Sequence, residues 1–164
     1  MIEHELTTRL QVYDSATELP IEAAILLQEA KKALVKSYSP YSGFQVGAAI
    51  RLVNGAIVSA ANQENASYPM CVCAEVAVLN AAAAMYPGIA MSSLAITTRH
   101  IQQPTTQPAA PCGQCRQTIL EYELRYGNTI SITMAGEQGQ VYEVASVKEL
   151  LPLHFSASDL GIKK

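Results

Sequence analysis

Hydrophobic residues recur at two different spacings along this chain of 164 residues. Between residues 21 and 38 they return every three to four positions, which predicts an amphipathic helix between Pro20 and Pro40. Two further segments are predicted as helices, residues 73–85, which are rich in Ala and Leu, and residues 112–125, and each is followed closely by a glycine that can end a helix. The pattern therefore predicts three helices of substantial length.

Shorter runs of alternating or β-branched apolar residues predict five strands, and these cover residues 44–53, 56–61, 94–98, 129–134 and 140–144. Asn54-Gly55 separates the first two runs and favours a hairpin with a type I′ turn, because both positions tolerate a positive φ. Strands interleaved with helices predict an α/β fold, in which a mixed five-stranded sheet carries helices on both faces.

The length fits one domain with a single core. We expect a leader at residues 1–19, one catalytic domain at residues 20–155 and a tail at residues 156–164. Because 49% of the residues are hydrophobic and only 15% are charged, the chain can bury a core and is not expected to be disordered.

The net charge of −3 argues against a nucleic acid polymer as partner, since such a surface would cluster Lys and Arg. The most apolar stretch, residues 76–85, is too short to span a bilayer, and residues 1–10 lack the apolar centre of a signal peptide. We therefore expect a cytoplasmic protein without a membrane partner. In that compartment four cysteines favour metal binding or reactive thiols over disulfides.

Three of the cysteines lie at predicted helix starts, in the segments Cys73-Ala74-Glu75 and Pro111-Cys112-Gly113-Gln114-Cys115. Unpaired N–H groups at a helix start lower thiol pKa values and help to hold thiolates on a metal. Zinc on three protein ligands keeps a fourth position for water, which is the pattern of a catalytic site. Glu75 would then remain free to move protons to and from that water.

Other readings of the cysteines stay open at this point. Cys71 could complete a closed structural zinc site with the other three, although Glu75 would then have no role. Cys112 and Cys115 alone could form a redox pair, which would leave Cys73 unused. Cys71 by itself is most simply interpreted as a small buried residue.

Five segments in this order resemble the small, homotetrameric type of cytidine deaminase, over roughly residues 37–155. They are residues 39–49 (Ser-Pro-Tyr-Ser-Gly-Phe-Gln-Val-Gly-Ala-Ala), 62–69 (Asn-Gln-Glu-Asn-Ala-Ser-Tyr-Pro), 73–75, 111–117 and 150–155 (Leu-Leu-Pro-Leu-His-Phe). The resemblance implies a three-layer α/β/α fold and one zinc ion per chain, bound by Cys73, Cys112 and Cys115. Glu75 would be the proton shuttle.

The same resemblance implies hydrolytic deamination of free cytidine or 2′-deoxycytidine, with release of ammonia, in pyrimidine salvage. Phe44 would pack on the base, and Phe155 would reach the site of a neighbouring subunit in the homotetramer. The substrate-binding residues that we expect are Phe44, Asn62, Glu64, Tyr68, Ala74 and Phe155. Asn62 and Glu64 would hold the ribose hydroxyls, and a carboxylate there would repel a phosphate.

Val76 departs from the pattern of the resembling family, which usually has Arg directly after the catalytic Glu. Without that cation the zinc should be less electrophilic, and Arg116, directly after Cys115, is a partial substitute. Blasticidin deaminases resemble this stretch in having an apolar residue after Cys-Ala-Glu. A deaminase of blasticidin or of other modified cytosine nucleosides is therefore the alternative.

Overall fold

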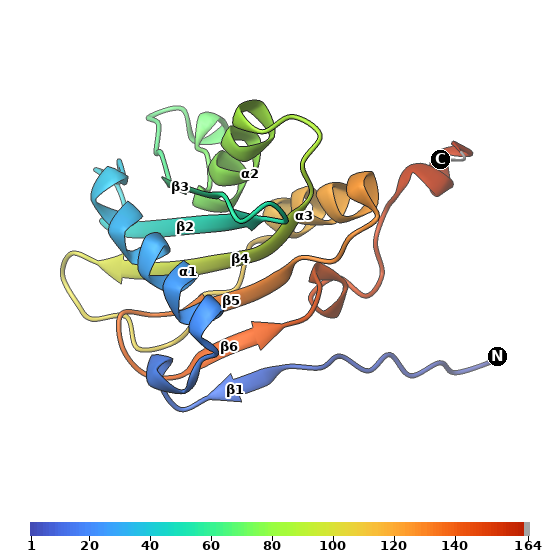
Figure 1. The fold of residues 1–164 in the computed structure, drawn as a ribbon, viewed down its shortest axis with the longest axis horizontal. Coiled ribbons are helices and arrows are strands. Elements are labelled where there is room, and N and C mark those ends of the chain that lie inside the picture. Colours follow the sequence, from blue (N-terminus) through green and yellow to red (C-terminus); the bar gives the residue numbers. More distant parts are fainter. Residues whose placement is uncertain (163–164) are drawn as a thin grey trace.

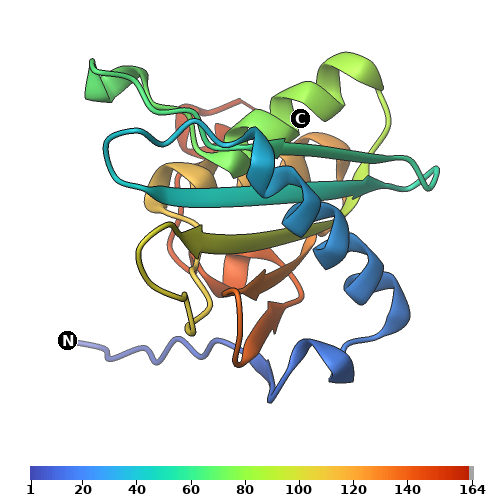
Figure 2. The ribbon, with the colours of Figure 1, turned by 90° about the vertical axis from the view of Figure 1, so that its left-hand side faces the viewer.

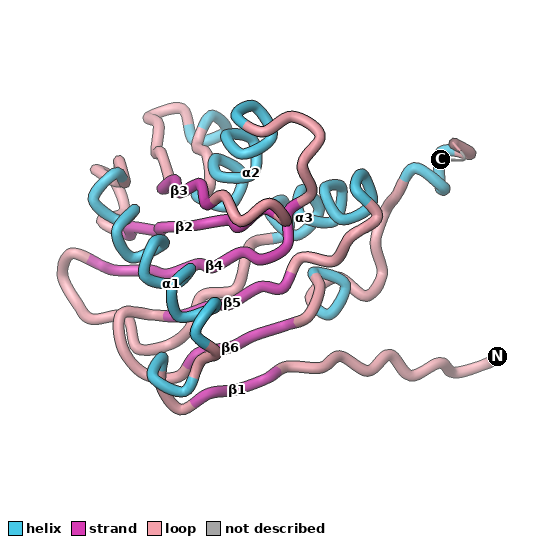
Figure 3. The backbone as a smooth tube through the Cα atoms, in the orientation of Figure 1, coloured by secondary structure: helices cyan, strands magenta, loops and turns pink. Residues whose placement is uncertain are grey.

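The computed structural model describes residues 1–162 and shows six strands in the spatial order β1-β6-β5-β4-β2-β3 (Figures 1 and 3). The strands are β1 (Gln11–Tyr13), β2 (Phe44–Leu52), β3 (Ile57–Ala61), β4 (Met91–His100), β5 (Ser131–Ala135) and β6 (Val141–Val144). The main helices are α1 (Ile21–Ala33), α2 (Ala74–Met85) and α3 (Gly113–Tyr126). No helix within the described part is long and apolar enough to cross a membrane.

The sheet is mixed, as predicted: β4 and β5 run parallel, and the other neighbouring strands run antiparallel. The strand count is six rather than five. The five predicted strands are present, and the sixth is β1, whose residues the sequence analysis assigned to the leader. Gln11 and Tyr13 pair with β6 at the edge of the sheet, so three residues of a largely polar segment join through backbone hydrogen bonds.

Helices cover both faces of the sheet, which confirms the three-layer arrangement (Figures 1 and 2). Helix α1 packs Leu26, Leu27 and Ala30 on one face, where the sheet contributes small residues such as Ala49 and Ala95. Gly47 lets this helix approach closely, because a Cβ at that position would overlap the Ala30 carbonyl oxygen.

Helices α2 and α3 cover the opposite face over a larger core. Val78 and Leu79 of α2 and Ile119 of α3 are fully buried there against Ile50 and Ile96 of the central strands. Burial of each such side chain contributes about 1.5–3 kcal/mol relative to leaving it exposed. This core fixes the starts of α2 and α3 above the sheet.

The β2–β3 hairpin is confirmed, but its turn is not the predicted type I′. Gly55 has a φ of 88°, whereas no residue other than glycine has a positive φ within residues 1–162. The Gly55 N–H donates to the Leu52 carbonyl (2.9 Å) and the Leu52 N–H donates to the Ala56 carbonyl (2.9 Å). These bonds close a three-residue loop in which only the last position is left-handed.

Candidate active site

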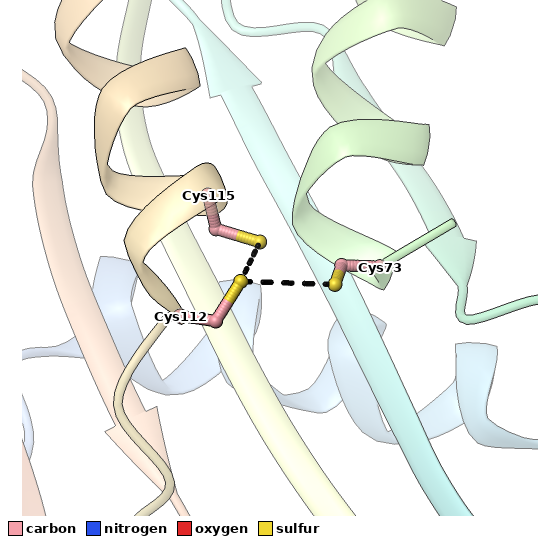
Figure 4. Close-up of side chains that lie close together, drawn as sticks. All are labelled: Cys73, Cys112 and Cys115. Atoms are coloured by element: carbon pink, nitrogen blue, oxygen red, sulfur yellow. Dashed lines mark hydrogen bonds between the residues drawn. The ribbon is translucent and has the colours of Figure 1, made fainter. Parts of the chain in front are cut away.

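The N-termini of α2 and α3 bring three cysteines together (Figure 4). Cys73 is the N-cap residue of α2, Cys112 is the N-cap residue of α3, and Cys115 lies one turn further along α3. The Cys112 sulfur is 4.0 Å from that of Cys73 and 3.4 Å from that of Cys115. All three sulfur atoms lie within 4.8 Å of one another.

The three thiols lie close enough together to shift one another's pKa values. The hydrogen bond with the Cys115 thiol lowers the pKa of Cys73 to about 7, although burial and the Glu75 carboxylate act in the opposite direction. The pKa of Cys115 is raised, first by its hydrogen bond to Cys73 and then by burial. A metal cation that replaces the thiol protons would stabilise such a cluster.

The donor set fits zinc. Three soft sulfur donors converge at two helix N-termini, and this number of protein ligands leaves one position of a tetrahedral ion for water or substrate. Cys71 is not part of this group: its sulfur accepts a hydrogen bond from the Asn65 N–H at 3.3 Å. The four-cysteine structural site is therefore not formed. Cys71 is also half-buried rather than fully buried.

Glu75 follows in the first turn of α2 and is 6% exposed. Burial raises the pKa of its carboxyl group, because a charged carboxylate loses hydration there. A carboxyl group with a raised pKa can take up a proton and release it again. Glu75 thus lies beside the cysteine cluster with the properties of a proton carrier.

A pocket of about 300 Å³ extends from the cysteines to the segment after β3. Its floor comes from β2 and β4, and its walls come from the segment 62–74 and the loop before α3. Eight of the predicted site residues line it: Phe44, Asn62, Glu64, Tyr68, Cys73, Ala74, Glu75 and Cys112. The sequence-predicted residues are thus largely gathered around one cavity.

At the end of the pocket away from the cysteines, the Asn62 side chain is hydrogen-bonded to the backbone of β2. Its Oδ1 accepts hydrogen bonds from the Val46 N–H (2.9 Å) and the Ser37 hydroxyl (2.6 Å), and its Nδ2 donates to the Phe44 carbonyl (2.9 Å). One N–H of the amide remains free of these three bonds. Asn62 can therefore donate to a ligand while it holds the pocket in shape.

Glu64 is oriented by the loop before β2. Its carboxylate accepts hydrogen bonds from the Tyr41 N–H (2.9 Å), the Ser42 N–H (3.3 Å) and the Ser42 hydroxyl. The Ser42 hydroxyl lowers the pKa of Glu64 most, and the two backbone bonds add to this effect. An ionised carboxylate fixed in this way has lone pairs left to accept hydrogen bonds from hydroxyl groups.

Tyr68, although it lines the pocket, and three further predicted residues are placed less directly. Tyr68 is 74% exposed at the pocket rim, and Phe155, 58% exposed, is not among the described residues that line the pocket. Val76 is half-buried on α2. The Arg116 guanidinium donates to the carbonyls of Pro111 and Leu150, both at 2.8 Å, so it braces the segment directly before Cys112.

The residues on the floor of the pocket were not predicted from the sequence. Val46 faces Thr98 in the β2–β4 register, Ile96 lies beside them, and Ala109 and Ala110 close the wall near α3. The alternation of side chains along β2 and β4 could have placed Val46, Ile96 and Thr98 on one face of the sheet. Their common position also required the register between two strands that lie about 50 residues apart in the sequence.

The chain is similar in sequence to cytidine deaminases. The sequence profile "Cytidine and deoxycytidylate deaminase zinc-binding region" matches residues 21–129, which include all three clustered cysteines and Glu75. A cytidine deaminase of Halalkalibacterium halodurans is 34% identical over 141 residues, covering 86% of this chain and 99% of that protein. A cytidine deaminase of Mycobacterium tuberculosis is 38% identical over 98 residues, or 60% of this chain and 69% of the relative.

Solved structures agree with the sequence matches. The crystal structure of cytidine deaminase from Burkholderia pseudomallei superposes with a TM-score of 0.70 and 37% identity, and it covers 84% of this chain and all of that chain. The crystal structure of cytidine deaminase from Mycobacterium tuberculosis gives a TM-score of 0.65 and 29% identity, with 84% and 99% coverage. The fold and the sequence thus point to the same relatives.

Proposed function

The chain belongs to the cytidine and deoxycytidylate deaminase family, and from this premise we propose that it hydrolyses free cytidine or 2′-deoxycytidine to uridine or 2′-deoxyuridine, with release of ammonia. The observation that carries the proposal is the position of Glu75, buried beside three convergent cysteine sulfurs at one end of a pocket of about 300 Å³. Cys73, Cys112 and Cys115 would hold one zinc ion per chain.

The two ends of the pocket orient the substrate. Ribose hydroxyls would donate to the Glu64 carboxylate and accept from the free N–H of Asn62, and the base would lie over the apolar floor beside Phe44. This orientation puts the ring carbon that bears the amino group at the cysteine end. The start of α2, with Ala74 and Glu75, then faces the ring nitrogen next to that carbon.

Glu75 carries the protons of the reaction. It would accept a proton from the attacking water and pass it to the ring nitrogen. It would then take the remaining proton from the same oxygen and give it to the amine, which leaves as ammonia while the carbonyl forms. Bound zinc supplies a Lewis acid that lowers the pKa of water towards neutrality. Burial of Glu75 favours its protonated form between these steps, because the raised pKa makes the carboxyl group a better holder of the proton.

The pocket favours a nucleoside over a nucleotide or a nucleic acid. A 5′-phosphate near the sugar-binding end would bring negative charge towards Glu64, whose hydrogen bonds keep it ionised. The chain also carries a net charge of −3, which disfavours a polyanion. The substrate class is therefore a free cytosine nucleoside.

We also propose that the enzyme acts in the cytoplasm, in pyrimidine salvage, as a homotetramer with shared sites. Phe155 supports the assembly: its carbonyl accepts a hydrogen bond from Gln117 of α3 at 2.9 Å, while the residue is 58% exposed. An exposed aromatic ring on an anchored backbone suits a contact with a neighbouring subunit.

The Glu75→Gln variant tests the mechanism. The amide keeps the size of the side chain but cannot shuttle protons, so cytidine turnover should fall about 10²–10⁴-fold while zinc content stays at one per chain. Loss of cytidine absorbance gives the rate, and metal analysis gives the zinc. Glu29→Gln, on the surface of α1, is the control and should retain both. A Glu75→Gln enzyme with most of its activity would refute the role of Glu75.

A further inference from the structure

Cys112 is the least protected of the three clustered cysteines. It is exposed, whereas Cys73 is half-buried and Cys115 is fully buried in α3. It also ends the irregular segment between β4 and α3, and as the N-cap residue it lies before the first full turn of the helix. Packing therefore holds this sulfur less than the other two, and its position depends on the backbone on either side of it.

One residue, Arg116, binds the backbone on both sides of Cys112. Its N–H donates to the Cys112 carbonyl at 2.9 Å, and its side-chain Nε donates to the Pro111 carbonyl at 2.8 Å. The Pro111 carbonyl belongs to the peptide plane that precedes Cys112, and the Cys112 carbonyl belongs to the plane that follows it. Because φ and ψ of Cys112 describe how these two planes are turned, the two bonds together fix the direction of its Cα–Cβ bond.

The guanidinium group of Arg116 is itself anchored on a separate part of the fold. Its Nη1 donates to the carbonyl of Leu150, 34 residues further along the chain, at 2.8 Å. Leu150 packs against the larger core and directly follows a short 3₁₀ helix in which Val147 is fully buried. Two nitrogens of one planar group thus join the peptide plane before Cys112 to a buried segment outside α3.

The next residue along α3 provides a comparison. Gln117 also donates from its side chain to a carbonyl of the C-terminal segment, that of Phe155, at 2.9 Å. This bond fastens the same segment to α3, but it does not involve the peptide planes around Cys112. Arg116 and Gln117 thus contribute similarly to the packing of the C-terminal segment, and they differ in whether they hold a cysteine of the cluster.

We propose that Arg116 is a positioning residue of the metal site, which acts on zinc through the two peptide planes of Cys112 and through its anchor on Leu150. This step rests on the proposed binding of zinc by Cys73, Cys112 and Cys115. Residues that orient a metal ligand without touching the metal typically change its affinity about 10–100-fold. The effect comes from the bonds to the two side-chain-bound carbonyls, and not from positive charge beside the thiolates, which is the role that the sequence suggested for Arg116.

The test measures zinc affinity by competition with a chelator, and the gap between the melting temperatures of the zinc-loaded and zinc-free protein. Arg116→Met has a flexible apolar side chain without donors, so its zinc affinity should fall about 10–100-fold and the gap should narrow. Gln117→Met is the matched control, because it loses only the bond to Phe155, and both its affinity and its gap should equal those of the wild type. A purely structural role of Arg116 would lower both melting temperatures equally and leave the gap unchanged.

Arg116→Lys separates the bonds from the charge, and it also serves if Arg116→Met does not fold. Lysine keeps the positive charge but carries its donors on a single nitrogen, so it does not reproduce the two bonds of the planar guanidinium group. Its zinc affinity should lie between those of Arg116→Met and the wild type. Wild-type affinity in Arg116→Lys, or an unchanged affinity and gap in Arg116→Met, would overturn this proposal alone. Failure of the wild type to bind zinc would overturn the proposed zinc site and, with it, the role of Arg116.

Discussion

At one end of the pocket the chemistry comes from the first turns of two helices, whereas at the other end Asn62 and Glu64 come from the segment that follows β3. Cys73, Cys115 and Glu75 form few bonds to the rest of the fold, and they are held by the buried helices that carry them. Asn62 and Glu64 instead accept several backbone hydrogen bonds.

From this difference we expect the two ends to tolerate substitutions differently. In the proposed function, each side chain at the cysteine end serves the metal or the proton transfer, and the fold is not expected to depend on it. At the other end, which is the proposed sugar-binding end, Asn62 and Glu64 shape the loops and would also contact the substrate, so a substitution there should alter both. The following predictions probe that contrast, beginning with the largest expected effect.

Cys112→Ser should cause the greatest loss. A hydroxyl is a poor substitute for a thiolate on zinc, so the variant should lose its metal, and activity should fall by about a thousandfold or more. Metal analysis and cytidine turnover measure the two effects. Cys71→Ser is the control, because Cys71 lies outside the cluster, and it should keep one zinc per chain. Release of zinc by Cys71→Ser, with retention by Cys112→Ser, would contradict the three-cysteine site.

Glu64→Gln should have a smaller effect, of a different kind. The neutral amide is a weaker acceptor for ribose hydroxyls and for the N–H groups of Tyr41 and Ser42, so KM for cytidine should rise about 10–100-fold. Zinc content should not change. The Glu29→Gln variant, at a half-buried position on α1 away from the pocket, should keep the wild-type KM. A Glu64→Gln enzyme that lost zinc but kept its KM would show that the two ends do not act independently.

Much of the cysteine end could be predicted from the sequence, because it depends on local rules. Residues three apart at a helix start share a face, so Cys112 and Cys115 had to lie together. Glu75, two residues after Cys73, was expected beside the same cleft, and the structure buries it there. Helix starts are set by nearby residues, and the structure differs from the predicted starts of α2 and α3 by a single position.

The rest depends on contacts between distant segments, which spacing does not encode. Strand β1 pairs with β6 although it comes from a segment with no clear apolar alternation. Thr98 reached the pocket floor through its register with Val46, and neither residue belongs to a motif. Arg116 was expected to offset the charge of the thiolates, yet its hydrogen bonds go to the Pro111 and Leu150 carbonyls. The position of Arg116 in the sequence could not show whether its side chain would bind the thiolates or these carbonyls.

Ser42→Ala should have the smallest effect, and one that depends on pH. The Ser42 hydroxyl lowers the pKa of Glu64 more than any other group does, so the wild-type carboxylate stays ionised to a pH below its ordinary pKa of 4.5. Removing the hydroxyl moves this pKa back upwards, because the bond favours the charged form. As the pH falls, protonated Glu64 can no longer accept fully from ribose hydroxyls, so KM should begin to rise at a higher pH in the variant than in the wild type.

The measurement is KM for cytidine between pH 7 and pH 4, with Ser39→Ala as the control. Ser39 lies in the same loop, but its hydroxyl pairs with Ser37 instead of Glu64, so the control should follow the wild-type curve. At pH 7 Ser42→Ala should differ little from the wild type, because the N–H groups of residues 41 and 42 still hold the carboxylate. Coinciding curves for all three proteins would mean that Glu64 is not the group whose charge binds the sugar. The sugar end would then depend on Asn62, whose amide does not titrate.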